Sequence, residues 1–404
     1  MIRFTTYALL PCAALIGASC SVTSAAQNAT APAQSTELPE NAPLDPSLKN
    51  IPATVGRANL TPSPPPFAIT QIGQFASPFA LAFLPDGRLL VTEKPGHLKL
   101  RATDGSVAEI AGVPATAQVG QGGLLDVAIA PDFTASKRIY LSYSEPRAQG
   151  SSLALATATL GATALENLQV IWRAGSDGPG GQFGANIAFA PDGKSLFLSS
   201  GERQRFTPAQ DPDQALGKIL HLTLDGKPAP GNPMASAGGV RAATWSTGHR
   251  NPYGLAFDPA GRLWEIEMGP KGGDELNLIL PGRNYGWPIV SNGDNYSGQP
   301  IPDHPSRPDL EAPKLWWNPS ISPGGLILYS GALFPAWKGS AFIAALSGEA
   351  LIRVTLNGTT AAPADQWKMG MRIRDLAQAP DGAIWLLEDG KGEHGRLFRI
   401  TPKT

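Results

Sequence analysis

The sequence predicts an all-β protein with the architecture of a six-bladed β-propeller. A short segment with the pattern of a β-hairpin recurs six times along the chain. No helical pattern is longer than a couple of turns. The 404 residues contain 45 glycines and 39 prolines alongside 42% hydrophobic residues, which indicates many short elements around an adequate core.

Each copy of the repeat is an apolar strand, a turn of the Pro-Asp-Gly type and a second apolar strand, as in FLPDGRLLVTE from Phe83. One proline marks the same phase in all six copies: Pro85, Pro131, Pro191, Pro259, Pro335 and Pro380. Their spacing of 45 to 76 residues suits four-stranded blades with insertions between strands. Phe67–Phe75 is expected to supply the strand that closes the ring against the last blade. A pair of β-sandwiches built from the same hairpins is the alternative.

The residues before this body, which spans 67–404, have a different composition. Residues 1–19 combine a positive charge at Arg3 with a short apolar stretch, as in a signal peptide for export. Small residues precede Cys20, which resembles the lipid-attachment cysteine of bacterial lipoproteins; a plain cleaved signal peptide is the alternative. Residues 20–66 are rich in Ala, Pro, Ser and Thr without periodicity, which predicts a disordered tether. We therefore expect a periplasmic or outer-membrane protein that contacts the membrane only through an N-terminal lipid anchor.

Composition also argues against several partners and chemistries. The formal net charge is −1, so we expect no nucleic-acid partner. Both cysteines, Cys12 and Cys20, precede the body, which therefore holds no disulfide, thiolate zinc site or cysteine nucleophile. The five histidines lack metal-ligand spacing such as H-x3-H, which argues against zinc hydrolase chemistry.

Four segments between the repeats are more specific than turn patterns. They are GQGGLLDVAIAPDF (120–133), TGHRNPYGLAFDP (247–259), EMGPKGGDELNLILPGRNYGWP (267–288) and MRIRDLAQAPDG (371–382). Together they resemble the glucose/sorbosone dehydrogenase family, the aldose sugar dehydrogenases that use pyrroloquinoline quinone (PQQ). The resemblance extends from Phe67 to Pro402. It implies a six-bladed propeller, in agreement with the count of repeats.

The residues in these motifs have chemistry that suits such a cofactor. PQQ is a planar tricarboxylate, so its site needs forked cations and amide donors. Arg372 and Arg374 are two apart in a strand-like segment and point to the same face. Arg250 and Asn251 add a guanidinium and an amide beside a proline. The resemblance implies that these four residues and Gln121 contact the cofactor.

The resemblance also implies a calcium ion that bridges the quinone and the protein through oxygen ligands. Two of these ligands are backbone carbonyls in the family, which here belong to Gly269 and Pro270. Asp274 and Glu275 follow closely in the sequence. For these two acids, a role in turn stabilisation and a direct role in the site both remain open.

The sequence departs from the family at the position of the general base. Gln182 stands where the family has its catalytic histidine, and Asn186 stands where it has an arginine. A lysine that some members use on the cofactor is missing, with Ser347 near its place. Glu202 matches the acid that orients the histidine in relatives. An amide cannot accept the proton of a sugar hydroxyl, and losing a general base costs on the order of 10²–10⁴ in rate.

The function that these residues favour is an exported dehydrogenase that depends on PQQ and calcium. It would oxidise aldose sugars or related polyols and pass electrons to an extracytoplasmic acceptor, with activity weakened by Gln182. Glu202 is the candidate substitute base. The alternative is a catalytically silent propeller that binds a saccharide, cofactor or cell-envelope partner. A propeller lactonase or hydrolase would need a cluster of carboxylates around the central channel, which the sequence does not display clearly.

Overall fold

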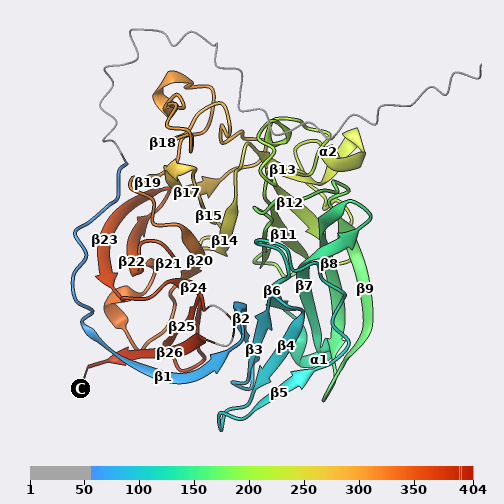
Figure 1. Cartoon of the computed structure of the whole chain (residues 1–404), viewed down its shortest axis with the longest axis vertical. Coiled ribbons are helices and arrows are strands. Elements are labelled where there is room, and N and C mark those ends of the chain that lie inside the picture. The colour runs from blue at the N-terminus through green and yellow to red at the C-terminus, as the bar shows by residue number, and fades with distance from the viewer. Residues whose placement is uncertain (1–55, 391, 393, 404) are drawn as a thin grey trace, which may run out of the picture. The chain divides into compact units, whose positions relative to one another are not determined.

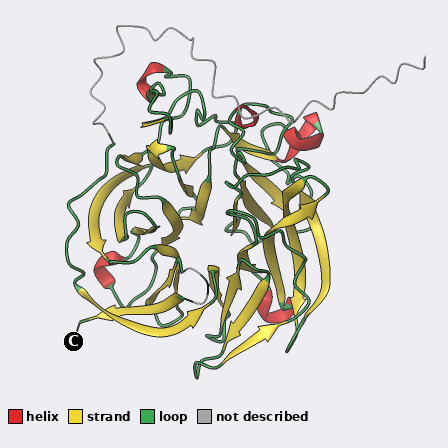
Figure 2. Ribbon diagram, viewed as in Figure 1, coloured by secondary structure: helices red, strands yellow, loops and turns green. Residues whose placement is uncertain are grey.

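A computed structural model describes residues 56–390, 392 and 394–403. The predicted signal peptide, Cys20 and most of the predicted tether lie outside this range. The described chain forms six four-stranded antiparallel sheets arranged in a ring around a central axis (Figure 1). Strands dominate the fold, and helices are confined to short segments (Figure 2). The prediction of a six-bladed propeller is confirmed, and the two-sandwich alternative is wrong.

The first three blades follow the chain from the innermost strand to the outermost. Blade 1 comprises β2 (Pro78–Phe83), β3 (Leu89–Glu93), β4 (His97–Arg101) and β5 (Val107–Ile110). Blade 2 comprises β6 (Leu124–Ile129), β7 (Arg138–Arg147), β8 (Gly150–Leu160) and β9 (Leu165–Arg173). Blade 3 comprises β10 (Gly184–Phe189), β11 (Ser195–Ser200), β12 (Lys218–Thr223) and β13 (Thr244–Thr247).

The next two blades keep the same order. Blade 4 comprises β14 (Pro252–Phe257), β15 (Leu263–Glu267), β17 (Asp274–Ile279) and β19 (Leu315–Trp317). Blade 5 comprises β20 (Pro323–Leu328), β21 (Ala341–Ala345), β22 (Ala350–Asn357) and β23 (Thr360–Lys368). A separate ribbon pairs β16 (Lys271–Gly272) with β18 (Gly293–Asp294). The short helices are α1 (Phe133–Ser136), α2 (Gly239–Ala243) and 3-10 turns at Thr207–Ala209, Ala235–Ala237, His304–Ser306 and Pro335–Trp337.

Blade 6 joins the two ends of the propeller. It comprises β24 (Ile373–Gln378), β25 (Ile384–Glu388), β26 (Gly395–Pro402) and β1 (Phe67–Phe75). β1 pairs antiparallel with β26, with Phe67 opposite Pro402 and Phe75 opposite Gly395. The predicted closing strand is therefore confirmed. All six marker prolines lie between the first and second strands of their blades, as the repeat predicted.

Hydrophobic side chains between neighbouring blades form the core. Several second strands are buried along their whole length: all five residues of β3, β15 and β21 and all six of β11. Such strands have neighbours on both faces, which explains why their apolar residues run almost continuously in the sequence. The packed strands hold the ring rigid. The loops at its ends are therefore the places where binding or catalytic side chains can be positioned.

Part of the predicted tether lies within the described range. Residues 56–66 run along blades 4 and 5, where the amide of Ala58 donates to the carbonyl of Trp316 at 2.8 Å. The amide of Ser63 donates to the carbonyl of Gln366 at 2.9 Å. These backbone contacts make residues 56–66 part of the folded body. Among the described residues, no helix has the length and apolar character needed to cross a membrane.

Candidate functional site

The site residues predicted from the sequence gather at one end of the propeller. In an antiparallel blade, the start of the first strand and the end of the second strand lie at the same edge. Six of the predicted residues lie just before, or at the start of, the first strand of a blade: Gln121, Gln182, Arg250, Asn251, Arg372 and Arg374. Directly after second strands lie Glu202, Gly269 and Pro270. The topology therefore places all nine on one rim of the propeller.

A cavity of about 310 Å³ opens on this rim. Its lining residues are Phe79, Lys94, Gln121, Tyr253, Met268, Tyr296, Ser322, Leu346, Arg372 and Arg374. Three of them carry positive charge and none is an aspartate or glutamate. The wall therefore combines apolar and aromatic surface with concentrated positive charge, which suits a flat organic anion.

Arg372 and Arg374 share one carboxylate behind the cavity. Nε of Arg372 donates to Oδ2 of Asp389 at 3.0 Å, and Nη2 of Arg374 donates to Oδ1 at 2.8 Å. Burial alone would raise the pKa of Asp389, but the two guanidinium groups hold it below its usual value. The guanidinium of Arg374 also lies over the rings of Phe79 and Tyr253, at 5.4 and 5.9 Å. These contacts fix both arginines while leaving one net positive charge.

Gln121 connects the cavity to Gln182. Its side-chain oxygen accepts hydrogen bonds from the backbone amide of Gln182 at 2.6 Å and from the Tyr253 hydroxyl at 3.1 Å. Gln182 has a φ of 54°, in the left-handed region. A non-glycine residue there needs such fixed contacts to hold it.

The side chains of Gln182, Glu202 and Arg250 form a closed network. The Gln182 amide directs its nitrogen to Oε1 of Glu202 and its oxygen to Nη2 of Arg250, at 2.8 Å, since the opposite orientation would set like groups against each other. Oε2 of Glu202 accepts the backbone amides of Arg205 and Phe206, both at 2.5 Å. All three side chains are at least 95% buried. Gln182 and Glu202 are thus in direct contact, but neither lines the cavity.

Burial raises the pKa of Glu202, whereas the amide of Phe206 and the charge of Arg250 act in the opposite direction. A carboxyl with a raised pKa is a better proton acceptor near neutral pH than an ordinary one. However, the Gln182 amide stands against its Oε1 and cannot relay a proton to it. The arrangement retains an acid with a raised pKa but lacks the imidazole that would connect it to a substrate.

Arg250 and Asn251 are held by a buried carboxylate. Oε2 of Glu267 accepts the backbone amides of Arg250 at 2.6 Å and of Asn251 at 3.2 Å. The guanidinium of Arg250 lies over the ring of Trp287 at 5.2 Å and donates to the Tyr296 hydroxyl at 3.3 Å. Since Tyr296 lines the cavity, Arg250 borders the cavity without lining it.

Gly269 occupies a crowded turn. A Cβ atom at this position would collide with the carbonyl oxygens of Gly272 and Gly273, so only glycine fits. Asp274 fixes the turn, since its Oδ1 accepts the amide of Gly269 at 2.9 Å and its Oδ2 accepts the amide of Ile321 at 2.7 Å. This supports the turn-stabilising role that the sequence left open for Asp274. The neighbouring Glu275 contacts His304, with Oε1 and Nε2 separated by 3.2 Å.

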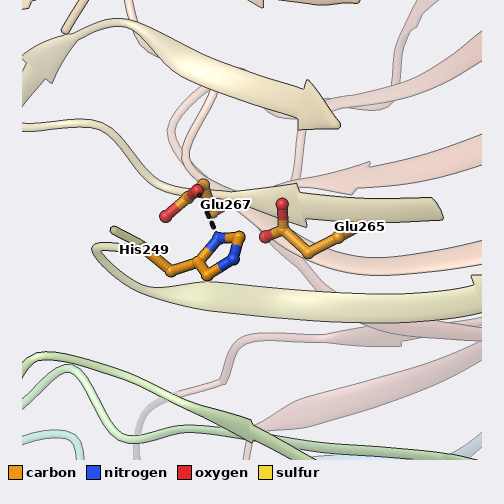
Figure 3. A group of neighbouring side chains, drawn as sticks. All are labelled: His249, Glu265 and Glu267. Atoms are coloured by element: carbon orange, nitrogen blue, oxygen red, sulfur yellow. Dashed lines mark hydrogen bonds and ion pairs between the residues drawn. The ribbon is translucent and has the colours of Figure 1, made fainter. Parts of the chain in front are cut away.

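His249, Glu265 and Glu267 form a buried cluster in blade 4 (Figure 3). One potential ligand atom from each lies within 4.8 Å of the others, which would allow a metal ion. However, both ring nitrogens of His249 already have partners: Nδ1 lies 3.2 Å from Oε1 of Glu267, and Nε2 lies 2.8 Å from Oγ of Ser246. Desolvation and the nearby charge of Glu267 raise the pKa of Glu265 well above its usual value. We interpret the cluster as support for the turn that carries Arg250.

Two further carboxylates belong to the innermost strands. Oδ2 of Asp126, on β6, accepts the amide of Ile187 on β10 at 2.8 Å. Oδ2 of Asp375, on β24, accepts the amide of Leu81 on β2 at 2.9 Å. Burial raises the pKa of Asp126 to about 6, and burial together with the charge of Asp126 raises that of Asp375. These acids join neighbouring blades, so their hydrogen bonds account for them without a hydrolytic role.

The sequence did not single out Lys94, Tyr253 or Tyr296 as site residues, although all three line the cavity. Lys94 directly follows a second strand, the same place in the repeat as Glu202 and Gly269. The phase of the repeat could therefore have identified it. Tyr296 lies in a segment without a repeat or a family motif, so no such signal pointed to it.

Comparisons with known proteins agree with this geometry. A family profile described as Glucose / Sorbosone dehydrogenase matches residues 75–399. The chain belongs to the glucose/sorbosone dehydrogenase family. The aldose sugar dehydrogenase YliI of Escherichia coli (strain K12) is 37% identical over 338 residues, covering 81% of this chain and 90% of its own.

Solved structures of the same family superpose closely. One described as glucose dehydrogenase has a TM-score of 0.79 at 42% identity, covering 83% of this chain and 100% of its own. The PQQ-bound aldose sugar dehydrogenase of Streptomyces coelicolor has a TM-score of 0.68 at 30% identity, and the match covers 84% of this chain and 99% of that structure. This member of the glucose/sorbosone dehydrogenase family therefore matches its relatives over nearly their whole lengths.

Proposed function

We propose that this chain is an exported dehydrogenase that depends on PQQ and calcium and oxidises aldose sugars or related polyols. The observation that carries the proposal is the cavity with three cationic side chains and no carboxylate in its wall. A tricarboxylate in this cavity would find forked donors in Arg372 and Arg374 and an amide in Gln121. The aromatic rings of Phe79 and Tyr253 would border a planar ligand.

PQQ fits these residues, and the chemistry that it supplies when bound is acceptance of a hydride from the sugar. The chain's own residues would bind and orient the two molecules. Arg372 and Arg374 would hold carboxylate groups, and Arg250, beside the cavity, would bind oxygen atoms at its edge. The apolar side chains of Met268 and Leu346 would exclude water from the reacting face.

For calcium, the residues that would serve as ligands are Gly269 and Pro270 through their carbonyl oxygens. The turn at Gly269 closes tightly, since a Cβ there would collide with the carbonyl oxygens of Gly272 and Gly273, and a calcium site would use the backbone oxygens of this turn. In this structure the Gly269 carbonyl accepts a hydrogen bond from Nη1 of Arg250 at 2.7 Å. A calcium ion at this carbonyl would lie beside the guanidinium, and the repulsion between the two cations would favour movement of Arg250 toward the anionic cofactor.

Among the described residues, the site lacks an obvious base to remove the proton of the sugar hydroxyl. Gln182 cannot accept or relay it, and Glu202 lies behind Gln182, so Glu202 can act as the acceptor only when the Gln182 side chain moves aside, and we expect low activity. The closed network of Gln182, Glu202 and Arg250 also favours a second candidate: a propeller that binds a saccharide, a cofactor or a cell-envelope partner without turnover.

The proposed electron acceptor follows from the predicted export. The N-terminal segment predicts a periplasmic or outer-membrane location with Cys20 as a lipid anchor, so the electrons would pass to an extracytoplasmic acceptor. A globomycin-sensitive change in the mobility of the full chain, lost in Cys20→Ala, would support the anchor. Unchanged mobility in both conditions would refute it.

Titration of the purified protein with PQQ in the presence of calcium chloride tests the proposed function. Quinone absorbance reports binding, and dye reduction across a panel of aldoses reports turnover. Binding with slow turnover is the expected result. Binding without turnover would favour the catalytically silent propeller. The absence of PQQ binding would refute both the assignment of PQQ as cofactor and the proposed dehydrogenase activity.

A further inference from the structure

Lys94 is held at the rim of the cavity by its backbone alone. It follows β3, and its amide donates to the carbonyl of Ser77 at 3.0 Å. Its carbonyl accepts the amide of Leu124 at 3.1 Å. Its ammonium group makes no hydrogen bond or ion pair within the part of the chain that the structure describes. The backbone is therefore fixed while the charged end faces a cavity.

The charges around Lys94 leave it uncompensated. Asp389 interacts favourably with it but is already shared by Arg372 and Arg374. The preceding Glu93 is committed elsewhere, since its Oε1 accepts the amide of Ala76 at 2.7 Å. Burial, and then the charge of Arg374, lower the pKa of Lys94. A half-buried ammonium beside a like charge is unfavourable unless an anion binds there.

The loop near Ser347 supplies no cation to the cavity. The Ser347 hydroxyl lies 2.7 Å from that of Ser322 and donates to the carbonyl of Ser320 at 3.2 Å. These hydrogen bonds join two loops of blades 4 and 5. Besides Arg250 at its border, the cavity has, among the described residues, one cation in its wall other than Arg372 and Arg374, and that residue is Lys94.

We propose that Lys94 is a direct ligand of the quinone cofactor, with its ammonium group paired to a carboxylate of bound PQQ. The inference rests on the proposed function and assigns a cofactor contact that the motifs do not contain. Lys94, Arg372 and Arg374 then offer three positive charges, one of which Asp389 neutralises. The charge that is unfavourable in the free protein becomes favourable when the anion is bound.

The test compares PQQ affinity between variants in the presence of calcium chloride, measured by quinone absorbance and by the ligand-induced rise in melting temperature. Lys94→Met removes the charge and keeps much of the length. Lys94→Arg keeps the charge. Lys99→Met is the matched control, because Lys99 lies on the same blade, pairs with Glu109 at 2.9 Å and with Glu93 at 3.7 Å, and does not line the cavity.

We expect Lys94→Met to raise the Kd for PQQ by roughly 10- to 100-fold, as for loss of a hydrogen bond to a charged group. Lys94→Arg should stay within a few-fold of the wild type, and Lys99→Met should match it. Without PQQ, Lys94→Met should melt at or above the melting temperature of the wild type. A lower melting temperature would instead indicate that Lys94 stabilises the fold. An unchanged Kd in folded Lys94→Met would overturn the assignment of Lys94 alone. Failure of the wild type to bind PQQ would overturn the proposed function and this inference together.

Discussion

Replacing Gln182 by histidine should increase the rate of aldose oxidation. The side chain at this position already lies between Glu202 and Arg250, so an imidazole could donate to the Glu202 carboxylate through one nitrogen. Its other nitrogen would take the place of the amide oxygen opposite Arg250, and it would accept the proton of a sugar hydroxyl once Arg250 turns toward the bound cofactor. Histidine also tolerates the left-handed backbone at this position, where φ is 54°, better than most residues do.

The expected gain follows from the contacts of Gln182. General base catalysis contributes typically about 10²–10⁴-fold. Glu202 would favour the protonated imidazole, whereas burial and the guanidinium of Arg250 would disfavour it. We therefore expect a gain near the lower end, about 10²-fold in kcat/KM, which corresponds to about 2.7 kcal/mol of activation free energy.

Steady-state dye reduction with PQQ, calcium and an aldose panel measures this gain, with quinone absorbance as a check on loading. Gln182→Asn is the control for a change of size without a base. The double variant Gln182→His with Glu202→Gln should lose much of the gain, because the imidazole is no longer oriented. No gain in fully loaded Gln182→His would refute the reasoning and favour the silent propeller.

Three further predictions concern acids and a turn. Glu202→Gln should abolish the weak activity of the wild type while PQQ absorbance is retained; equal rates would exclude Glu202 as the proton acceptor. Gly269→Ala should destabilise the fold by about 1–3 kcal/mol or more in urea unfolding, because its Cβ meets two carbonyl oxygens, and wild-type stability would contradict that packing. The pKa of Asp126 is raised from 3.8 to about 6, so its contribution to stability is complete below pH 3.8 and is lost as the pH rises through about 6. Urea unfolding between pH 4 and 7 should show up to about 3 kcal/mol of this loss in the wild type and a flatter profile in Asp126→Asn; parallel profiles would contradict the raised pKa.

The architecture could be predicted from the sequence because each blade repeats the same local signal. A proline-marked turn between two apolar strands identifies every hairpin, and Phe67–Phe75 was recognisable as the extra strand. The tether could not be bounded as well, since residues 56–66 are polar and proline-rich yet form backbone hydrogen bonds with blades 4 and 5. Backbone pairing of this kind leaves no pattern of side chains.

The site was predictable only where its residues belong to motifs. Gln121, Arg250 and Arg374 were found in this way, and the structure places all three at one rim. The sequence gives no sign that the Gln182 side chain is enclosed, because its burial depends on Glu202 and Arg250 from two other loops. Long-range packing decides which loop residues face the cavity and which lie behind its wall.

The pairing of β1 with β26 also has a consequence for biosynthesis. A ribosome makes β1 before all the other strands and β26 after them, so β1 has no partner while the five complete blades emerge. During that time it is an unprotected strand edge, open to pairing with other chains. Blade 6 also carries Arg372 and Arg374, so the cationic rim is assembled only when the ring closes. A prematurely terminated chain would therefore lack both the protected edge and the paired arginines.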